Sequence, residues 1–252
     1  MARQKLGQHF LFQASILERI AAAVCPLREE VVVEIGSGRG ALTEKLLKRA
    51  ERVVAIELDH SLADHLRQKF AGEPRLEIIH ADALTVDLSK WPGAPIAGNL
   101  PYYAATAIIG QTVRLRPCRA VFLIQKEVAD RLAAQPGTRE YGYLTVATRL
   151  FAEARLLFGV KPGAFHPPPK VDSAVVLLTP QADPLAVDNA NAEAFLRFVG
   201  LCFRHKRKTL RNNLAEEYGK ELVDAWPEAG LRAEQITMAG FVEIYRRLAN
   251  ER

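Results

Sequence analysis

Short apolar runs alternate with helix-like segments through the first two-thirds of the chain. The runs have the length of buried strands and cover residues 31–35, 53–57, 76–79, 96–98 and 120–125. Apolar residues at helical spacing follow the first two of them, in segments 41–49 and 61–70. Strands and helices that alternate in this way predict a mainly parallel sheet with helices on both faces.

The pattern changes after residue 150. Two further strand-like runs, 154–160 and 173–179, have no helix between them, so we expect an antiparallel pair joined by a long ordered loop. They bring the predicted sheet to seven strands. Beyond residue 180 the apolar spacing is helical. We therefore predict an α/β fold with a sheet domain over residues 1–180, a small helical domain over residues 181–252, and a linker that begins at residue 181.

The composition is that of an ordinary globular protein, with 252 residues of which 49% are hydrophobic. No apolar run approaches the roughly 18–20 residues that cross a bilayer, and the N-terminus lacks the apolar core of a signal peptide. The three cysteines, Cys25, Cys118 and Cys202, are widely spaced and odd in number, which indicates neither a disulfide framework nor a zinc site. We expect a cytoplasmic protein that binds no membrane and no metal.

The net charge of +5 is modest, but basic residues cluster near the C-terminus. Five of them lie within eight positions with no acid between them: Arg204, Lys206, Arg207, Lys208 and Arg211. If this segment is helical, Arg204, Lys208 and Arg211 share one face. The cluster is a candidate phosphate-binding surface, and a merely solvated helical face is the alternative. Arg3 and Lys5 are weaker candidates, because termini are often charged.

A glycine-rich segment separates the first strand from the first helix. It reads Gly36-Ser37-Gly38-Arg39-Gly40, a G-x-G-x-G spacing in place of the G-x-G-x-x-G of a dinucleotide site. Glu34 precedes it, and a carboxylate there suits a pyrophosphate poorly but can orient the loop and the ammonium group of an amino acid. By itself the pattern is also compatible with a plain tight turn.

Acidic residues follow the next two strands. Glu57 ends the second strand about 20 residues after the loop, where a carboxylate accepts hydrogen bonds from ribose hydroxyls. Asp82 follows the third strand, where an adenine amino group is a suitable partner. Either acid can instead cap a helix, although Asp59 is the better capping candidate in its region. Together with the glycine loop, the two acids predict S-adenosylmethionine as cofactor, bound outside the carboxyl ends of the strands.

The fourth strand leads into a turn of unusual composition, Asn99-Leu100-Pro101-Tyr102-Tyr103. The Asn99 side-chain oxygen and the Leu100 carbonyl can accept hydrogens from an exocyclic amine such as N6 of adenine. Pro101 stiffens the turn and Tyr102 offers a stacking face. Phe165 is a candidate for the opposite stacking face, with a place in the core as the alternative. A methyl bound to a sulfonium is already activated, so placement of the amine and exclusion of water suffice for its transfer.

Five blocks of sequence carry a resemblance to a known family. They are residues 7–11 (GQHFL), 34–38 (EIGSG), 98–102 (GNLPY), 165–173 (FHPPPKVDS) and 207–212 (RKTLRN). With them the chain resembles the small-subunit (16S) ribosomal RNA adenine N6,N6-dimethyltransferases, which are class I S-adenosylmethionine-dependent enzymes with a Rossmann-like methyltransferase fold. The resemblance spans nearly the whole length.

The resemblance implies a function and a set of site residues. The family methylates N6 of two adjacent adenosines near the 3′ end of 16S rRNA, dimethylating each, during small-subunit biogenesis. The implied partner is therefore 16S rRNA in an immature small ribosomal subunit, and the implied state is a monomer. The positions implied to hold the cofactor are His9, Leu11, Gly36, Glu57, Asp82 and Asn99.

This chain departs from the family pattern at two positions. His9 stands where the family usually has Asn; an imidazole can also donate a hydrogen bond, so we expect the cofactor contact to survive. Tyr103 stands where smaller or polar residues are common. The sequence assigns it no role.

Four alternatives to this interpretation are considered. The nearest is the 23S rRNA adenine methylase of macrolide resistance, from which the 165–173 block and the long helical tail distinguish this chain. A second is a ribosome-assembly factor whose methylation is secondary or lost, which the intact cofactor positions disfavour. A third is cytosine C5 methylation, which needs a cysteine nucleophile; Cys118 lies far in sequence from the Asn99 turn and is interpreted as structural. Amide and DNA adenine methylases usually carry two prolines in this turn, where this chain has Leu100.

Overall fold

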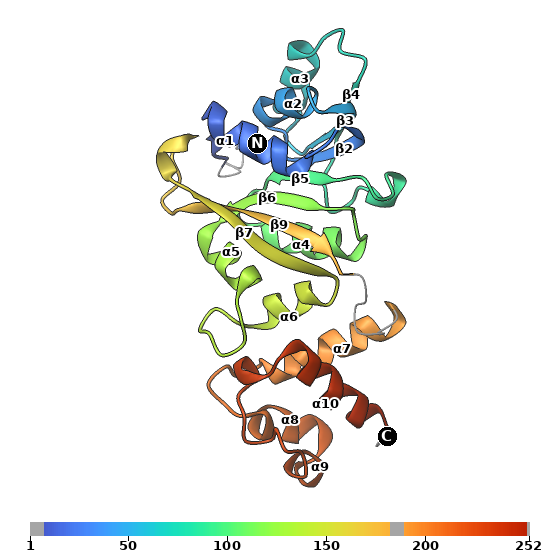
Figure 1. The fold of residues 1–252 in the computed structure, drawn as a ribbon, viewed down its shortest axis with the longest axis vertical. Coiled ribbons are helices and arrows are strands. Elements are labelled where there is room, and N and C mark those ends of the chain that lie inside the picture. The colour runs from blue at the N-terminus through green and yellow to red at the C-terminus, as the bar shows by residue number, and fades with distance from the viewer. Residues whose placement is uncertain (1–7, 182–188, 251–252) are drawn as a thin grey trace, which may run out of the picture. The chain divides into compact units, whose positions relative to one another are not determined.

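The central sheet has seven strands in the order β4-β3-β2-β5-β6-β9-β7 (Figure 1). The structure is a computed structural model that describes residues 8–181 and 189–250. The strands are β2 (Glu29–Ile35), β3 (Ala50–Glu57), β4 (Leu76–His80), β5 (Ile96–Asn99), β6 (Ala120–Gln125), β7 (Ala152–Val160) and β9 (Ser173–Pro180). The first five pair with one another in parallel, whereas β9 runs antiparallel to β6 and β7. The prediction of a mainly parallel seven-stranded sheet is confirmed.

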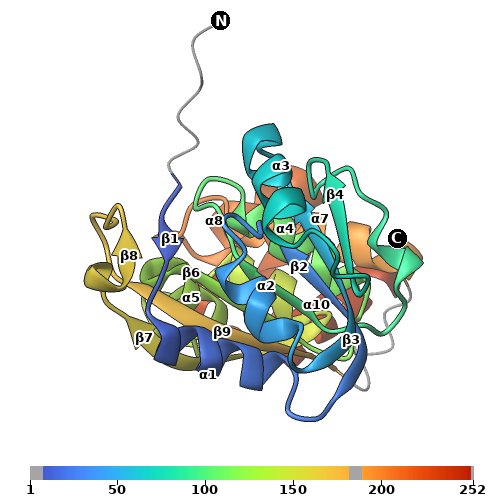
Figure 2. The same cartoon turned by 90° about the horizontal axis from the view of Figure 1, so that it is seen from above.

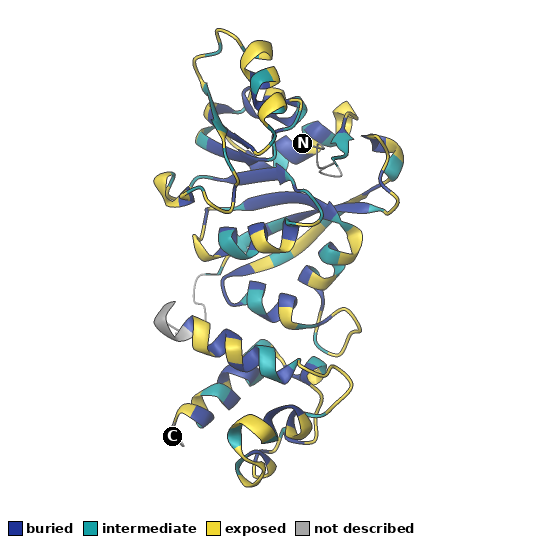
Figure 3. Ribbon diagram, turned by 180° about the vertical axis from the view of Figure 1, so that it is seen from behind, coloured by how far each residue is buried: buried dark blue, intermediate teal, exposed yellow. Residues whose placement is uncertain are grey.

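Helices cover the sheet. They are α1 (Ala14–Val24), α2 (Ala41–Leu46), α3 (His60–Lys69), α4 (Ala105–Arg114) and α5 (Lys126–Ala133), with a short 3-10 turn η1 (Leu88–Lys90). Both α1 and α4 contact β6, and they lie on opposite sides of the sheet (Figure 2). Helix α2 is shorter than the predicted 41–49, because residues 47–49 turn the chain back into β3. Strand β6 is buried along almost its whole length, and β9 is buried over its first four residues (Figure 3).

The strand order reverses at β2, which pairs with β3 on one side and β5 on the other. Such a reversal opens a crevice outside the carboxyl ends of the two central strands. Here β5 approaches β2 so closely that a Cβ at Gly98 would lie 2.5 Å from the Ile35 carbonyl oxygen. Glycine at this position therefore brings the Asn99 turn against the end of β2.

A second, two-stranded sheet joins the N-terminal segment to the 161–172 loop. It pairs β1 (Phe10–Leu11) antiparallel to β8 (Phe165–His166), directly after the 3-10 turn η2 (Pro162–Ala164) (Figure 2). The side chains of Leu11 and Phe165 are partners in the register and both belong to the apolar core. This ladder holds the start of the chain beside the central strands.

The chain divides into two compact units, one of Met1–Ala129 with Ala152–Pro180 and one of Asp130–Phe151 with Gln181–Arg252. The break after Pro180 coincides with the predicted boundary, but residues 130–151 group with the C-terminal helices. The second unit holds the end of α5 and then α6 (Tyr143–Arg149), α7 (Asn189–Cys202), α8 (Leu210–Tyr218), α9 (Lys220–Asp224), η3 (Ala233–Gln235) and α10 (Met238–Asn250). Across the described residues, no helix is long and apolar enough for a membrane crossing.

Candidate active site

Two cavities adjoin at the carboxyl ends of β2 and β5, and Phe10, Gly36, Gly38 and Asn99 line both. The first is also lined by five other residues that the sequence singles out, namely His9, Glu57, Asp82, Leu100 and Tyr102. Pro101 and Tyr103 complete the turn at its edge. Leu11 lines the second cavity together with Glu34 and Lys69. The structure therefore gathers the predicted cofactor residues around one crevice, divided between two connected spaces.

The glycine loop forms one wall of both cavities. Gly36 and Gly38 have φ angles of 74° and 54°, a left-handed conformation that side chains rarely adopt. A Cβ at Gly38 would also lie 3.2 Å from the Phe10 ring. The Arg39 guanidinium lies over the Phe10 ring, 4.6 Å from the ring centroid. Gly38 is thus packed against β1, and a larger residue at this position would crowd the Phe10 ring.

Glu57 ties this loop to the end of β3. One carboxylate oxygen accepts the Gly38 backbone N–H at 2.8 Å, and the other accepts the Asp59 N–H at 2.9 Å. Burial raises the pKa of Glu57, although the two backbone N–H groups act against that shift. Each carboxylate oxygen has a further lone pair, so Glu57 can also accept hydrogen bonds from a ligand in the cavity.

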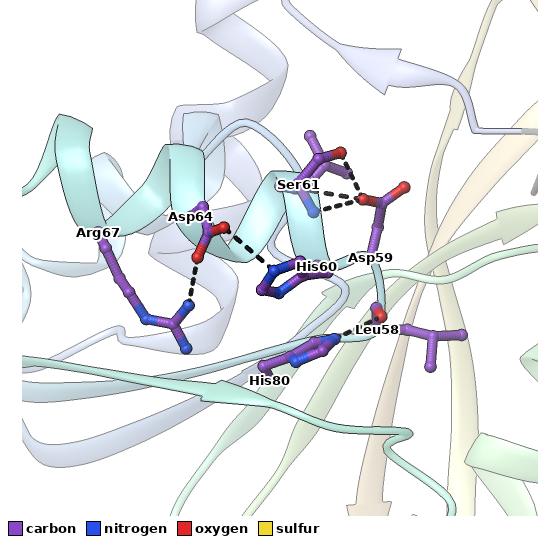
Figure 4. A network of polar contacts seen from close by, with 8 residues as sticks. Leu58, Asp59, His60, Ser61, Asp64, Arg67 and His80 are labelled. Atoms are coloured by element: carbon purple, nitrogen blue, oxygen red, sulfur yellow. Dashed lines mark hydrogen bonds and ion pairs between the residues drawn. The ribbon is translucent and has the colours of Figure 1, made fainter. Parts of the chain in front are cut away.

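Asp59 caps α3, as the sequence predicts (Figure 4). Its carboxylate accepts the backbone N–H groups of Ser61 at 2.8 Å and Leu62 at 3.3 Å. A second hydrogen bond holds the backbone between Glu57 and α3. It joins His80 Nε2 to the Leu58 carbonyl oxygen at 3.2 Å (Figure 4). These contacts fix Leu58, which lines the first cavity.

Asp82 lies in the turn after β4 rather than at a helix start. One of its oxygens, Oδ1, accepts the Leu84 N–H at 2.9 Å, which closes the turn. Its other oxygen has no hydrogen-bond partner among the described residues. Asp82 is exposed and lines the first cavity, so this second oxygen is free to accept a hydrogen bond from a bound molecule.

Glu34 is buried beneath the loop, with 1% of its surface exposed. Its carboxyl group accepts a hydrogen bond of 2.5 Å from the hydroxyl of Thr43 on α2. Burial raises the pKa of Glu34 to about 7, against the opposing effect of the Thr43 hydrogen bond. Glu34 therefore links β2 to α2 and orients the loop, which is one of the two roles that the sequence suggests for it.

Asn99 is oriented by the N-terminal segment. Its side-chain Nδ2 donates to the His9 carbonyl at 2.9 Å. Since a carbonyl can only accept, the amide nitrogen must face His9, and the side-chain oxygen faces away from it. This oxygen has no partner among the described residues, and Asn99 lines both cavities. The side chain thus presents a free acceptor, as the sequence predicts.

The His9 ring does not have the donor that we expect from it. Its Nδ1 lies 2.8 Å from the Pro167 carbonyl and must donate to it. In the neutral ring, the other nitrogen, Nε2, is then an acceptor only. His9 therefore lines the cavity but, when neutral, does not offer the free N–H that the family's Asn would supply.

Tyr102 lies between the cavity and the core. Its hydroxyl is 2.8 Å from the Ser173 hydroxyl at the start of β9, and Ser173 is fully buried. Its ring centroid is 5.8 Å from that of His9, and burial raises the pKa of Tyr102. The phenol is fixed at its far end, which leaves the ring in a defined place at the cavity wall.

The structure does not bring Phe165 to the cavity. Phe165 is only 3% exposed and packs in the core, while the next residue, His166, is exposed. Successive side chains in a strand point to opposite faces, so β8 directs Phe165 inward. The assignment of Phe165 as an opposing stacking face is therefore replaced by the alternative, a core aromatic.

Cys118, which is interpreted from the sequence as structural, lines neither cavity.

The basic cluster lies in the second unit, and apart from Arg211 on α8 it is not helical. Helix α7 ends at Cys202 and α8 begins at Leu210, so residues 203–209 form turns and the predicted common helix face is wrong. The reason is buried Asn213 on α8. Its side chain accepts the His205 N–H at 3.1 Å and donates to the Cys202 carbonyl at 2.8 Å, which ends α7 and folds the turns back. We call residues 203–209 the basic loop.

The basic side chains differ in their partners. Arg204 pairs with Glu216 at 3.3 Å, Arg211 pairs with Asp224, and Lys206 donates to the Arg139 carbonyl. Arg207 and Lys208 are exposed and make no ion pair with any described residue. Together with Lys206, whose partner is an uncharged carbonyl, these two residues carry the uncompensated charge of the basic loop.

Several site residues have no clear signal in the sequence. Phe10 and Leu58 line the first cavity as apolar residues beside motif positions, and Ser173 holds Tyr102 from 71 positions away. Only their adjacency to Glu57 or their place in a motif block could have indicated them. Within the described ranges, no group of His, Cys, Asp and Glu side chains is arranged to hold a metal ion.

The family model described as "Ribosomal RNA adenine dimethylase" matches residues 1–250. The chain belongs to the ribosomal RNA adenine dimethylase family. Two similar members of known name are each called "Ribosomal RNA small subunit methyltransferase A". The one from Acidobacterium capsulatum is 43% identical, over 98% of this chain and 91% of its own. The one from Legionella pneumophila (strain Corby) is 39% identical, over 98% of each chain.

Solved structures agree on the fold. A dimethyladenosine transferase from Plasmodium falciparum matches 96% of this chain and 98% of its own with a TM-score of 0.83 at 24% identity. The 23S rRNA methyltransferase ErmE matches 93% of this chain and 98% of its own with a TM-score of 0.72 at 30% identity. The Rossmann-like methyltransferase fold is therefore confirmed for this ribosomal RNA adenine dimethylase.

Glu34→Gln is expected to remove part of the pH dependence of stability. The unfolded carboxyl has a pKa near 4.5 and the folded one a pKa of about 7, so between these values only the unfolded chain releases its proton. Stability then falls as pH rises, by on the order of 3 kcal/mol above pH 7. Urea unfolding at pH 5 and pH 8 measures this loss in both proteins. An equal loss in Glu34→Gln would contradict the assignment.

The Tyr102–Ser173 contact predicts an asymmetric mutational cycle. Tyr102→Phe leaves the buried Ser173 hydroxyl without a partner and is expected to lower the free energy of unfolding by ~1–3 kcal/mol. Ser173→Ala leaves the phenol, which is only half-buried and can reach water, so its cost is smaller. The double variant is expected to recover much of the loss from Tyr102→Phe. Simple additivity in thermal unfolding would show that the two hydroxyls are not coupled.

Proposed function

We propose that this protein transfers methyl groups from S-adenosylmethionine to N6 of two adjacent adenosines near the 3′ end of 16S rRNA, dimethylating each. The substrate is an immature small ribosomal subunit, and the enzyme acts as a monomer in the cytoplasm. The observation that carries the proposal is Asn99, whose side-chain oxygen is left free at the cavity by the hydrogen bond from its nitrogen to His9.

The residues around the first cavity fit S-adenosylmethionine. Glu57 and Asp82 offer carboxylate oxygens at two successive strand ends, as ribose hydroxyls and an adenine amino group require. The glycine loop at Gly36 and Gly38 lets the backbone line the space between them without side chains. Leu11 and Asn99 belong to the adjoining cavity, which leaves room for the amino-acid end of the cofactor. When bound, the cofactor supplies a methyl group that its positive sulfur has already activated.

The Asn99 turn then acts on the adenine amine. The lone pair of N6 is delocalised into the ring, which makes this nitrogen a weak nucleophile. The Asn99 oxygen and the Leu100 carbonyl accept its two hydrogens, which favours an amine whose lone pair is directed away from them. Pro101 limits the flexibility of the turn. The Tyr102 ring, anchored through Ser173, supports the base after it has left its own stack.

The similarity to ErmE keeps a 23S rRNA substrate as the second candidate. The small-subunit substrate is better supported, because the relatives from Acidobacterium and Legionella have the higher identity and carry that name. An assembly factor without methylation is disfavoured, since Gly36, Glu57, Asp82 and Asn99 all line the crevice.

We further propose that the basic loop binds rRNA through Arg207 and Lys208. Both side chains are exposed and lack an acidic partner among the described residues. Arg204 and Arg211 each face a carboxylate, which already compensates part of their charge. Basic side chains without such a partner attract phosphates most strongly. When they neutralise phosphates of the RNA, the counterions bound to those phosphates are released.

The activity predicts a specific product. With radiolabelled S-adenosylmethionine, the protein is expected to produce N6,N6-dimethyladenosine in small subunits isolated from a strain that lacks this methyltransferase. Asn99→Ala is expected to lower the rate roughly 10- to 100-fold, because it removes an acceptor for N6. Cys118→Ala, outside both cavities, is expected to keep full activity. Label in large subunits alone would move the assignment to 23S rRNA, and label in neither would support an assembly factor.

The basic loop predicts unequal effects from two variants that each remove two positive charges. Arg207→Ala with Lys208→Ala is expected to weaken subunit binding and to lower the slope of log K against log salt by about one to two. Arg204→Ala with Arg211→Ala is expected to change the slope less, since both residues are paired. Filter binding between about 50 and 200 mM salt measures both. Equal slopes in the wild type and the first variant would exclude the loop as an RNA contact.

A further inference from the structure

Tyr103 is an exposed aromatic at the mouth of the first cavity. It contributes to the cavity lining, yet 67% of its surface is exposed. A single exposed aromatic on a surface needs no explanation. What distinguishes Tyr103 is its place, next in sequence to Tyr102 and on the rim of the cavity that holds Asn99.

The two consecutive tyrosines have different environments. Tyr102 is half-buried, bonded to Ser173 and beside the His9 ring. Tyr103 has neither a hydrogen bond nor a ring contact with any described residue. Both lie in the turn that the Ala104 N–H closes onto the Pro101 carbonyl at 3.0 Å, so the backbone of Tyr103 is fixed although its ring has no partner. Truncation of this ring would remove little packing from the fold.

We propose that Tyr103 forms a second subsite, which stacks on the nucleobase next to the target adenine. This inference rests on the proposed function, because a flanking base is present only if the substrate is a nucleic acid. An adenine that enters the cavity leaves the stack, and the neighbouring base then exposes a face that it previously covered. An aromatic ring at the mouth covers this face, and such stacking accepts any base. Tyr102 supports the target and Tyr103 supports its neighbour.

The test separates RNA recognition from cofactor binding. For Tyr103→Ala, the KM for immature small subunits is expected to rise by a factor between about 5 and 150, the range for loss of one stacked base. The dissociation constant of S-adenosylmethionine, measured by calorimetry, is expected to stay at the wild-type value. Tyr103→Phe keeps the aromatic ring and is expected to have the wild-type KM. Tyr143→Ala removes an exposed tyrosine outside both cavities and serves as the matched control.

A fluorescent substrate reports stacking directly. In an RNA hairpin with 2-aminopurine beside the target, emission is expected to be quenched by the wild type and by Tyr103→Phe, but not by Tyr103→Ala. An unchanged KM for Tyr103→Ala, a KM rise no larger than that of Tyr143→Ala, or a parallel loss of cofactor affinity would each overturn the subsite while leaving the proposed function intact. Absence of methyl transfer by the wild type would overturn both.

Discussion

The hydrogen bond from Asn99 Nδ2 to the His9 carbonyl connects residues 90 positions apart, and the arrangement of the site depends on it. It determines which atom of the amide faces the cavity. It also fixes the N-terminal segment across the ends of β2 and β5, where the β1–β8 ladder holds that segment from the other side. The wall that Phe10 adds to the glycine loop follows from this position. A short segment at the start of the chain thus completes a site whose floor is the central sheet.

Two buried glutamates stabilise the glycine loop through different contacts. Glu57 fixes the loop through the Gly38 N–H and fixes the start of α3 through the Asp59 N–H. Glu34 fixes the following helix α2 through Thr43. Burial raises the pKa of both carboxyl groups, because it disfavours their charged forms. The contacts that hold the loop therefore form at a cost in free energy when these groups are ionised. Only Glu57 lines the first cavity, which is why the two acids are not interchangeable.

The strands, their parallel order and the crevice at their ends could be predicted from the sequence, because buried parallel strands read as continuous apolar runs and their carboxyl ends share one edge. The same reasoning predicts that Asn99, Glu57 and Asp82 lie near one another, and all three line the first cavity. Phe165 could not be placed, since two residues of β8 carry no periodicity and tertiary pairing decides which one faces inward. The basic loop is not the helix that its charge spacing predicts, because hydrogen bonds from buried Asn213 hold it in turns and charge spacing does not reveal such a contact. The segment 130–151 likewise groups with helices that begin only at Asn189.

Asn213 has a consequence for how the basic loop meets a ligand. Its three hydrogen bonds, to the backbone of Cys202 and His205, hold the backbone of the loop in one conformation before any contact is made. A segment that is already ordered loses little conformational entropy on association, so more of its electrostatic attraction is available as affinity. The side-chain amide of Asn213 thus lowers the entropic cost of binding although it does not contact the ligand.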